Sequence, residues 1–136
     1  MALGNKQAKL TKYGEQKIQR KMKQIGVAIE SEAKRNLTDE GAVDTGRLRS
    51  SITHKVLSDG RVIVGTPVKY APYIEFGTSP HFPPPSAIKD WVRRVISPDE
   101  SVLDDIAFVI ARSISRTGTP ARPFLRSAID KVRNSL

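Results

Sequence analysis

The sequence contains no cysteine and only two histidines among its 136 residues. Without thiols the chain cannot form disulfides, thiolate metal sites or a cysteine nucleophile. His54 and His81 are too few for a histidine-rich metal cluster, although a site that pairs them with carboxylates stays open. We therefore expect no metal and no cofactor. A chain of this length buries enough surface to fold without such cross-links.

Long apolar runs are also absent. The longest one, around residues 106–111, is far shorter than the roughly 20 residues needed to cross a bilayer. Residues 1–12 are polar and rich in lysine, which is not typical of a signal peptide. We expect a soluble protein that is made in the cytoplasm and has no contact with a membrane.

Acidic residues are few: the sequence has 14 aspartates and glutamates and 23 lysines and arginines, which gives a net charge of +9. Most of the excess lies in the first 37 residues, which favours an anionic partner or neighbour. Three interpretations remain open, namely a solvated helix face, a surface that faces DNA, and a surface that pairs with an acidic neighbouring subunit. The candidate residues of this surface are Lys17, Arg20, Lys21, Lys23, Lys34 and Arg35.

The apolar spacing predicts a long helix over residues 11–37. Its apolar side chains recur every three or four positions, which is typical of one helical face. They are Ile18, Met22, Ile25, Ile29, Ala33 and Leu37. We expect residues 1–10 to form a flexible basic arm, and residues 38–41 to end the helix in a turn.

The middle of the sequence predicts a β-hairpin. Residues 49–57 alternate in polarity, residues 61–65 are β-branched, and the triplet 58–60 (SDG) between them is a strong turn signal. Residues 70–78 are expected to form a single helical turn or bent segment packed on the hairpin. Residues 79–85 carry four prolines and are predicted to be a loop.

Three further helices are expected, over about 87–96, 101–115 and 124–134. Ser86 is a candidate cap for the first, and Pro123 suits the start of the last. The residues expected to point inward on the first two are Ile88, Trp91, Val92, Val95, Val102, Ile106, Val109 and Ile110. The predicted fold is therefore α+β over residues 1–136 as a single domain, with a long N-terminal helix and C-terminal helices packed on a small antiparallel β-sheet.

Three strings stand out within this pattern: 43–52 (VDTGRLRSSI), 70–78 (YAPYIEFGT) and 118–125 (GTPARPFL). In this order, behind a basic helix, they resemble the bacteriophage tail-component family. Its members are small neck or tail-completion proteins encoded among the head–tail joining genes of long-tailed phages and prophages. The resemblance extends from Ile18 to the C-terminus.

The resemblance implies a structural subunit without enzymatic activity. Such a subunit forms a ring around the DNA channel at the head–tail interface of the virion. Its expected partners are copies of itself, connector or head-closure proteins and tail proteins, with non-specific contact to DNA as a further option. A monomer in isolation is compatible with this role, because such subunits can order their loops on assembly.

The strings also have a direct physical interpretation. Gly46 can take a positive φ beside the capping side chains of Asp44 and Thr45. The aromatic residues of the second string offer a large area for burial. Glu75 lies among them, so we expect it to pair with a cation, with Arg47, Arg49 and Arg122 as candidates. The candidate subunit or partner contacts are Arg47, Arg49, Tyr70, Tyr73, Glu75, Phe76, Thr78, Arg122 and Phe124.

Two alternatives compete with this role. The triplet 44–46 (DTG) also occurs in aspartic proteases, but that chemistry needs two carboxylates that share one proton. Arg47 lies beside Asp44 and favours full ionisation of the Asp44 carboxyl group. The glycine-rich hairpin that forms the flap of such proteases is also not evident. The stronger rival is a basic nucleic-acid-binding protein, although no helix-turn-helix, RNP-like or zinc-finger pattern is present. We therefore expect no catalytic residues.

Overall fold

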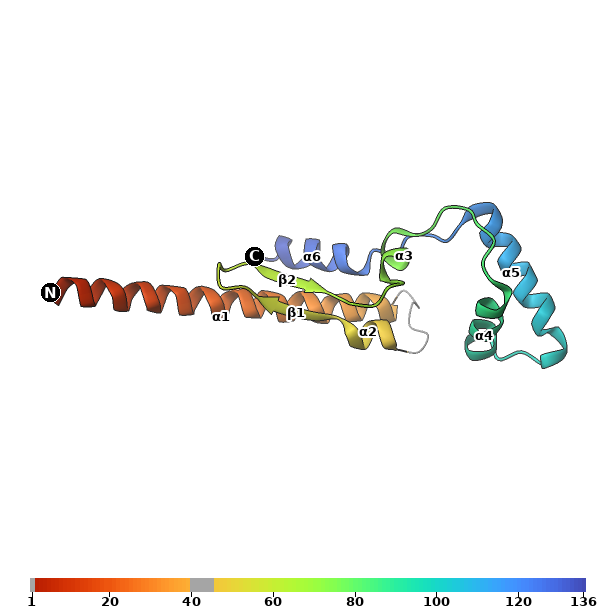
Figure 1. Cartoon of the computed structure of the whole chain (residues 1–136), viewed down its shortest axis with the longest axis horizontal. Coiled ribbons are helices and arrows are strands. Elements are labelled where there is room, and N and C mark those ends of the chain that lie inside the picture. Colours follow the sequence, from red (N-terminus) through yellow and green to blue (C-terminus); the bar gives the residue numbers. More distant parts are fainter. Residues whose placement is uncertain (1, 40–45) are drawn as a thin grey trace.

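The computed structural model describes residues 2–39 and 46–136, without the side chains of residues 2–8 and 10. The molecule is elongated (Figure 1), and helix α1 (Ala2–Asp39) forms much of its length. Strands β1 (Thr53–Val56) and β2 (Val62–Gly65) and helix α6 (Phe124–Asn134) lie along the second half of α1. The predicted α+β fold with a small antiparallel sheet is confirmed.

Helix α1 begins at Ala2, so residues 2–10, which we expected to form a flexible basic arm, are part of this helix. This segment has no proline and consists largely of alanine, leucine, lysine and glutamine, which favour helix. Toward the N-terminus of α1, its contacts with the hairpin end near the β1–β2 turn. There Gln19 Nε2 donates a hydrogen bond to the Leu57 carbonyl at 3.0 Å. The preceding part of α1 extends beyond every other element (Figure 1).

The predicted β-hairpin is confirmed, with Thr53 opposite Gly65 and Val56 opposite Val62. The first strand is shorter than expected, because helix α2 (Arg47–Ser51) takes up its predicted beginning. Gly46, with φ of 79°, starts this helix, and the Ser50 N–H donates to its carbonyl at 2.9 Å. The positive φ predicted for this glycine therefore turns the chain into a helix before it reaches the strand.

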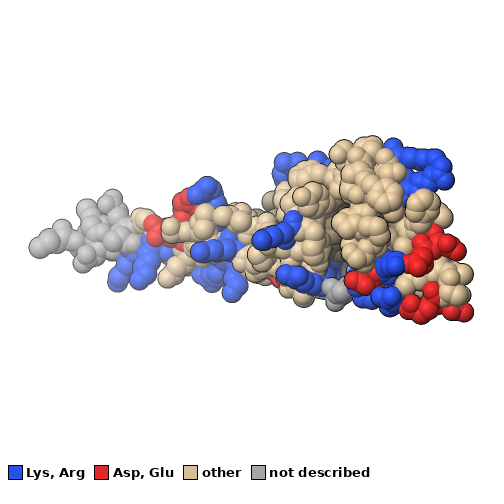
Figure 2. All heavy atoms as spheres, turned by 45° about the vertical axis from the view of Figure 1, so that its right-hand side comes forward, with Lys and Arg blue, Asp and Glu red and all other residues tan. Residues whose placement is uncertain are grey.

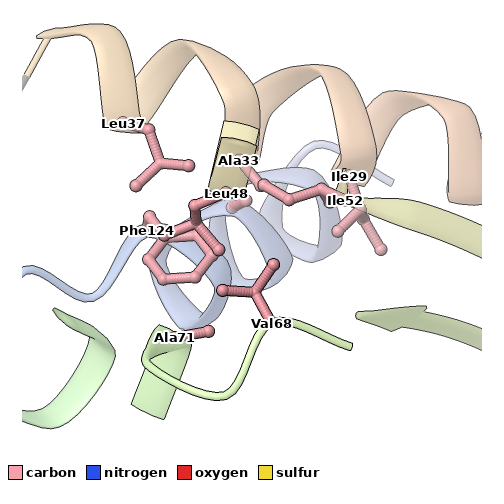
Figure 3. Packing of buried hydrophobic residues seen from close by; sticks show 9 residues of the cluster. Ile29, Ala33, Leu37, Leu48, Ile52, Val68, Ala71 and Phe124 are labelled. Carbon is pink, nitrogen blue, oxygen red and sulfur yellow. The ribbon is translucent and has the colours of Figure 1, made fainter. Parts of the chain in front are cut away.

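The core lies where α1, α2, α6 and the segment before α3 (Ala71–Phe76) meet (Figure 3). Ala33 of α1 and Ala128 of α6 have no exposed surface, and such small side chains let two helices approach closely. Phe124 is the largest side chain in this core. The other members are Ile29, Leu37, Leu48, Ile52, Val68 and Ala71.

Helices α4 (Pro85–Val95) and α5 (Leu103–Thr117) form a helical hairpin that stands away from this core (Figure 1). The 3₁₀ turn η1 (Glu100–Val102) precedes α5. Two chain segments connect the hairpin to the rest of the molecule, and they pair at Thr78 and Thr119. Each backbone N–H donates to the other residue's carbonyl, at 3.1 and 3.3 Å.

The predicted inward faces of α4 and α5 are partly wrong. Val92 is buried, as expected, but Trp91, Val95, Val102 and Val109 are exposed. Helix α5 packs mainly on α4, so it buries only one narrow stripe, made of Leu103, Ala107 and Ala111. Ser86 is also not the cap of α4, because the helix already begins at Pro85.

Candidate functional site: a groove that joins three distant strings

An open groove of about 1220 Å³ lies between α2 and α3 on one side and the α4–α5 hairpin on the other. Arg47 and Arg49 of the first string line it. So do Tyr70 and Tyr73 of the second string, and Arg122 of the third. The three strings are far apart in the sequence, and the fold brings parts of all of them to one surface.

Of the nine predicted contact residues, six line this groove. They are Arg47, Arg49, Tyr70, Tyr73, Thr78 and Arg122. The other three, Glu75, Phe76 and Phe124, are not among its lining residues. Each of them has a different structural environment.

Glu75 is buried and does not pair with an arginine side chain as predicted. Its carboxylate oxygens accept the backbone N–H groups of Leu125 at 2.9 Å and Arg126 at 3.0 Å. These donors belong to the first turn of α6, where backbone N–H groups lack partners within the helix. The positive end of the helix dipole adds to this interaction. Glu75 therefore caps α6 and fixes α3 to it.

The aromatic residues of the second string, which offered a large area for burial, are exposed in the single chain. Tyr73 is 62% exposed and Phe76 is 69% exposed. Helix α3 is a little longer than one turn and buries only Ala71 and Glu75, so its aromatic side chains point elsewhere. The guanidinium carbon of Arg126 lies 5.9 Å from the centre of the Phe76 ring, within the range of a cation–π contact. Phe124, in contrast, is a core residue that is 2% exposed.

The groove is basic and partly apolar. Four arginines line it, and no aspartate or glutamate is among the lining residues that the structure describes. Trp91, Val95 and Ile114 contribute apolar surface from the hairpin. Arginine forms forked hydrogen bonds with carboxylates, and aromatic rings provide contact area. This chemistry fits a protein segment that carries carboxylates among apolar side chains.

The sequence did not indicate that the hairpin forms one side of the groove, through Trp91 and Arg94 of α4. It placed Trp91 on an inward apolar stripe. The spacing of Trp91, Arg94 and Val95 puts an arginine on the same helical face as the two apolar residues. That arginine was the available signal that the face is not buried.

A family model described as "Bacteriophage HK97-gp10, putative tail-component" matches residues 2–77, more than half of the chain. The chain belongs to this family of phage tail components. Neither the curated proteins nor the solved structures compared with the chain match it. The predicted resemblance is confirmed, and the chain is thus a structural component of a phage particle.

The family match covers α1 to α3, and therefore the first string and all of the second string except Thr78. It begins at Ala2, earlier than the Ile18 at which we placed the start of the resemblance. The third string and the α4–α5 hairpin lie beyond the match. The groove of this tail component is therefore built partly from the matched region and partly from the segment that follows it.

The six basic candidates on α1 of this tail component form two groups. Lys17, Arg20, Lys21 and Lys23 are exposed on the first part of the helix. Lys34 and Arg35 instead lie near carboxylates, namely Glu30 at 2.9 Å and Glu32 at 3.3 Å. Glu32 also accepts a hydrogen bond from Lys131 of α6, which lowers its pKa. Only the first group is thus fully available to an external partner.

Residues 9, 11–39 and 46–136 contain no group of three or more histidine, aspartate or glutamate side chains that could hold a metal ion. Within the described part of the chain, none of the helices is both long enough and apolar enough to span a bilayer. Asp44 and Thr45, which belong to the protease-like triplet, lie outside the described residues.

Proposed function

We propose that this tail component is a neck or tail-completion subunit that forms a ring around the DNA channel at the head–tail junction. It acts by self-assembly and docking, without catalysis. The observation that carries the proposal is the groove to which the three strings contribute. This surface exists only when the chain is folded, because distant segments form it together. Its side chains are arginines and aromatic residues that can contact another protein.

The composition of the groove supports docking. Arginine, tyrosine and tryptophan are the residues most enriched where protein interfaces gain their affinity. Tyr73 is 62% exposed and Trp91 is 37% exposed, so both rings are accessible. We propose that the groove receives a segment of a connector, head-closure or tail protein that carries carboxylates. Arg49 and Arg122 would then form charge-assisted hydrogen bonds with it.

The nucleic-acid-binding alternative rests on the exposed group on α1, Lys17, Arg20, Lys21 and Lys23. Lysines and arginines on a helix face attract phosphates, but sequence is read through contacts with base edges. A channel-lining subunit would bind unrelated DNA sequences equally and lose this binding as salt rises. A gel-shift titration that shows sequence-selective binding at physiological salt would instead support a regulator.

The docking proposal is tested with phage whose copy of the gene is deleted and supplied in trans. We expect the deletion to leave filled heads and separate tails in electron micrographs, and the wild-type gene to restore joined particles. The Arg49→Glu/Arg122→Glu variant should fail to restore joining, because it reverses the charge of two of the four arginines that line the groove. Normal circular dichroism of this variant shows that the fold is intact.

Lys55→Glu/Lys69→Glu is the matched control. It changes the net charge by the same amount at two exposed residues that do not line the groove. This variant should restore joining to near the wild-type yield. Joined particles in normal yield from the Arg49/Arg122 variant would rule out the groove as a docking site. Normal particles from the deletion itself would rule out the proposed function.

A further inference from the structure

The closed end of the α4–α5 hairpin is acidic. Asp99, Glu100, Asp104 and Asp105 lie there, and Figure 2 shows acidic side chains gathered at this end of the molecule. Glu100 pairs with Arg93 at 3.0 Å, and Asp104 pairs with Lys89. These ion pairs are largely exposed, so each contributes little to stability and can be exchanged for a pair with another molecule.

Next to this acidic end, α5 presents an unusual outer face. Phe108 is 58% exposed and Val109 is 66% exposed. Asp105 precedes them by one helical turn, so carboxylate and apolar side chains share the face. Phe108 and Val109 thus present apolar area beside charged groups, and a partner protein can cover this area.

At the opposite end of the molecule, the first part of α1 has no neighbouring element (Figure 1). An isolated helix of roughly this length is only marginally stable in water, so a partner would stabilise it. Lys9, Tyr13 and Lys17 recur every four positions and share one face of this overhang. All are exposed, and the Tyr13 side chain is 60% exposed.

We propose that the outer face of α5 in one copy packs on the α1 overhang of the next copy. Asp104 and Asp105 would pair with the lysines of the overhang, and Phe108 and Val109 would cover Tyr13. The inference rests on the proposed self-assembly and names the two surfaces that carry it. They lie at opposite ends of the elongated chain, so they meet only between molecules (Figure 1). Such a head-to-tail contact closes into a ring when the rotation between copies permits it.

A second copy fits these surfaces better than DNA does. DNA would neutralise the lysines of the overhang, but it would leave Phe108 and Val109 of α5 uncovered. It would also be repelled by the acidic end of the hairpin. A second copy of the chain satisfies the charge and the apolar surface at both ends at once, and every subunit supplies both halves of the contact.

The absence of cysteine in the chain allows a direct test by disulfide trapping. Differently tagged Tyr13→Cys and Val109→Cys variants of the full chain are mixed at high concentration and oxidised mildly. We expect the heterodimer to exceed both homodimers on a non-reducing gel. The Tyr13→Cys/Val109→Cys double variant should give a ladder of covalent multimers. The matched control is Tyr13→Cys mixed with Ile63→Cys, whose side chain on β2 is 53% exposed, and it should give no such excess.

Charge reversal tests the pairing itself. In the cysteine background, Lys9→Glu/Lys17→Glu should lower the trapped heterodimer about tenfold, because like charges then face each other. Adding Asp104→Lys/Asp105→Lys to the partner should restore the yield. Lys55→Glu/Lys69→Glu is the control and should leave trapping unchanged.

The proposal is overturned if Val109 and Ile63 give equal trapping, or if charge reversal on the overhang abolishes DNA binding but leaves trapping intact. Failure of trapping in a protein that still restores head–tail joining would refute this contact and leave the proposed function standing. Efficient trapping in a protein that is dispensable for joining would support this contact and refute the proposed function.

Discussion

The carboxylate of Glu75 accepts the backbone N–H of Leu125 at 2.9 Å and thereby ties α3 to the start of α6. The whole α4–α5 hairpin lies between the two residues in the sequence, so this bond closes the loop from which the hairpin extends. Of the other α3 side chains, Tyr73 and Ile74 line the groove. A buried acid in the second string thus has a structural role, and the exposed tyrosines beside it are available for contact.

Replacing Glu75 should destabilise the fold. Glu75→Ala removes the acceptor for two N–H groups at a buried helix start and should lower the free energy of unfolding by about 2–3 kcal/mol. Glu75→Gln keeps one acceptor oxygen and should cost less. Urea unfolding followed by circular dichroism measures both values. Glu15→Ala, on the exposed overhang, is the control, and an equal effect of both alanine variants would contradict the capping role.

Phe124 and Tyr73 form a contrasting pair of aromatic residues. Phe124→Ala should lower the free energy of unfolding by about 3–5 kcal/mol, because it leaves a cavity in the core. Tyr73→Ala should change it by less than about 0.5 kcal/mol, because that side chain is mostly exposed. Thermal unfolding of both variants checks the difference. A large loss of stability in the Tyr73 variant would contradict the exposed position of this side chain.

The sequence was sufficient where local pattern decides structure. The turn triplet 58–60 and the β-branched run after it predicted the hairpin, and the spacing from Ile18 to Leu37 predicted most of α1. Periodicity cannot show how many neighbours a helix has. The apolar residues of α5 therefore looked like a wide buried face, although the helix packs mainly on α4 and leaves Val109 exposed.

The candidate site was harder to predict, because it depends on contacts between distant segments. The three strings contain Arg49, Tyr73 and Arg122, but the spacing of these residues in the sequence does not show that they meet in one groove. Glu75 illustrates the limit most clearly. Its partners are backbone N–H groups of α6, and a backbone donor leaves no signal in a list of charged side chains.

Glu30 should make stability depend on pH in the acid range. Its carboxylate lies 2.5 Å from His54 Nδ1 and accepts a hydrogen bond from Lys34 Nζ at 2.9 Å. The bond with His54, followed by that with Lys34, lowers the pKa of Glu30 below its ordinary value of 4.5. A lowered pKa stabilises the fold fully above the unfolded value, and this contribution is lost as pH falls through the folded value.

The matched variant is Glu30→Gln, which cannot ionise. Between roughly pH 5 and 3, the melting temperature of the wild type should fall more steeply than that of Glu30→Gln, because the wild type takes up an additional proton on unfolding. Glu15→Gln, on the exposed overhang, should follow the wild-type profile. Parallel profiles for the wild type and Glu30→Gln would show that the pair with His54 and Lys34 contributes no pH dependence.

Gly118 should tolerate no side chain. Its φ of 70° and ψ of −162° lie in a region that is essentially restricted to glycine. A Cβ atom there would come within 2.0 Å of the Thr78 carbonyl oxygen, which is a backbone atom and cannot rotate away. Gly118→Ala would therefore separate the two segments that pair at Thr78 and Thr119. We expect it to destabilise the fold by about 1–3 kcal/mol from the backbone strain alone, with the clash adding to this.

Gly14→Ala is the control, because its Cβ would meet nothing within 4 Å and alanine favours helix. Hydrogen exchange should show faster exchange at Thr78 and Thr119 in the Gly118 variant only, and unchanged protection there would contradict the close approach of these segments.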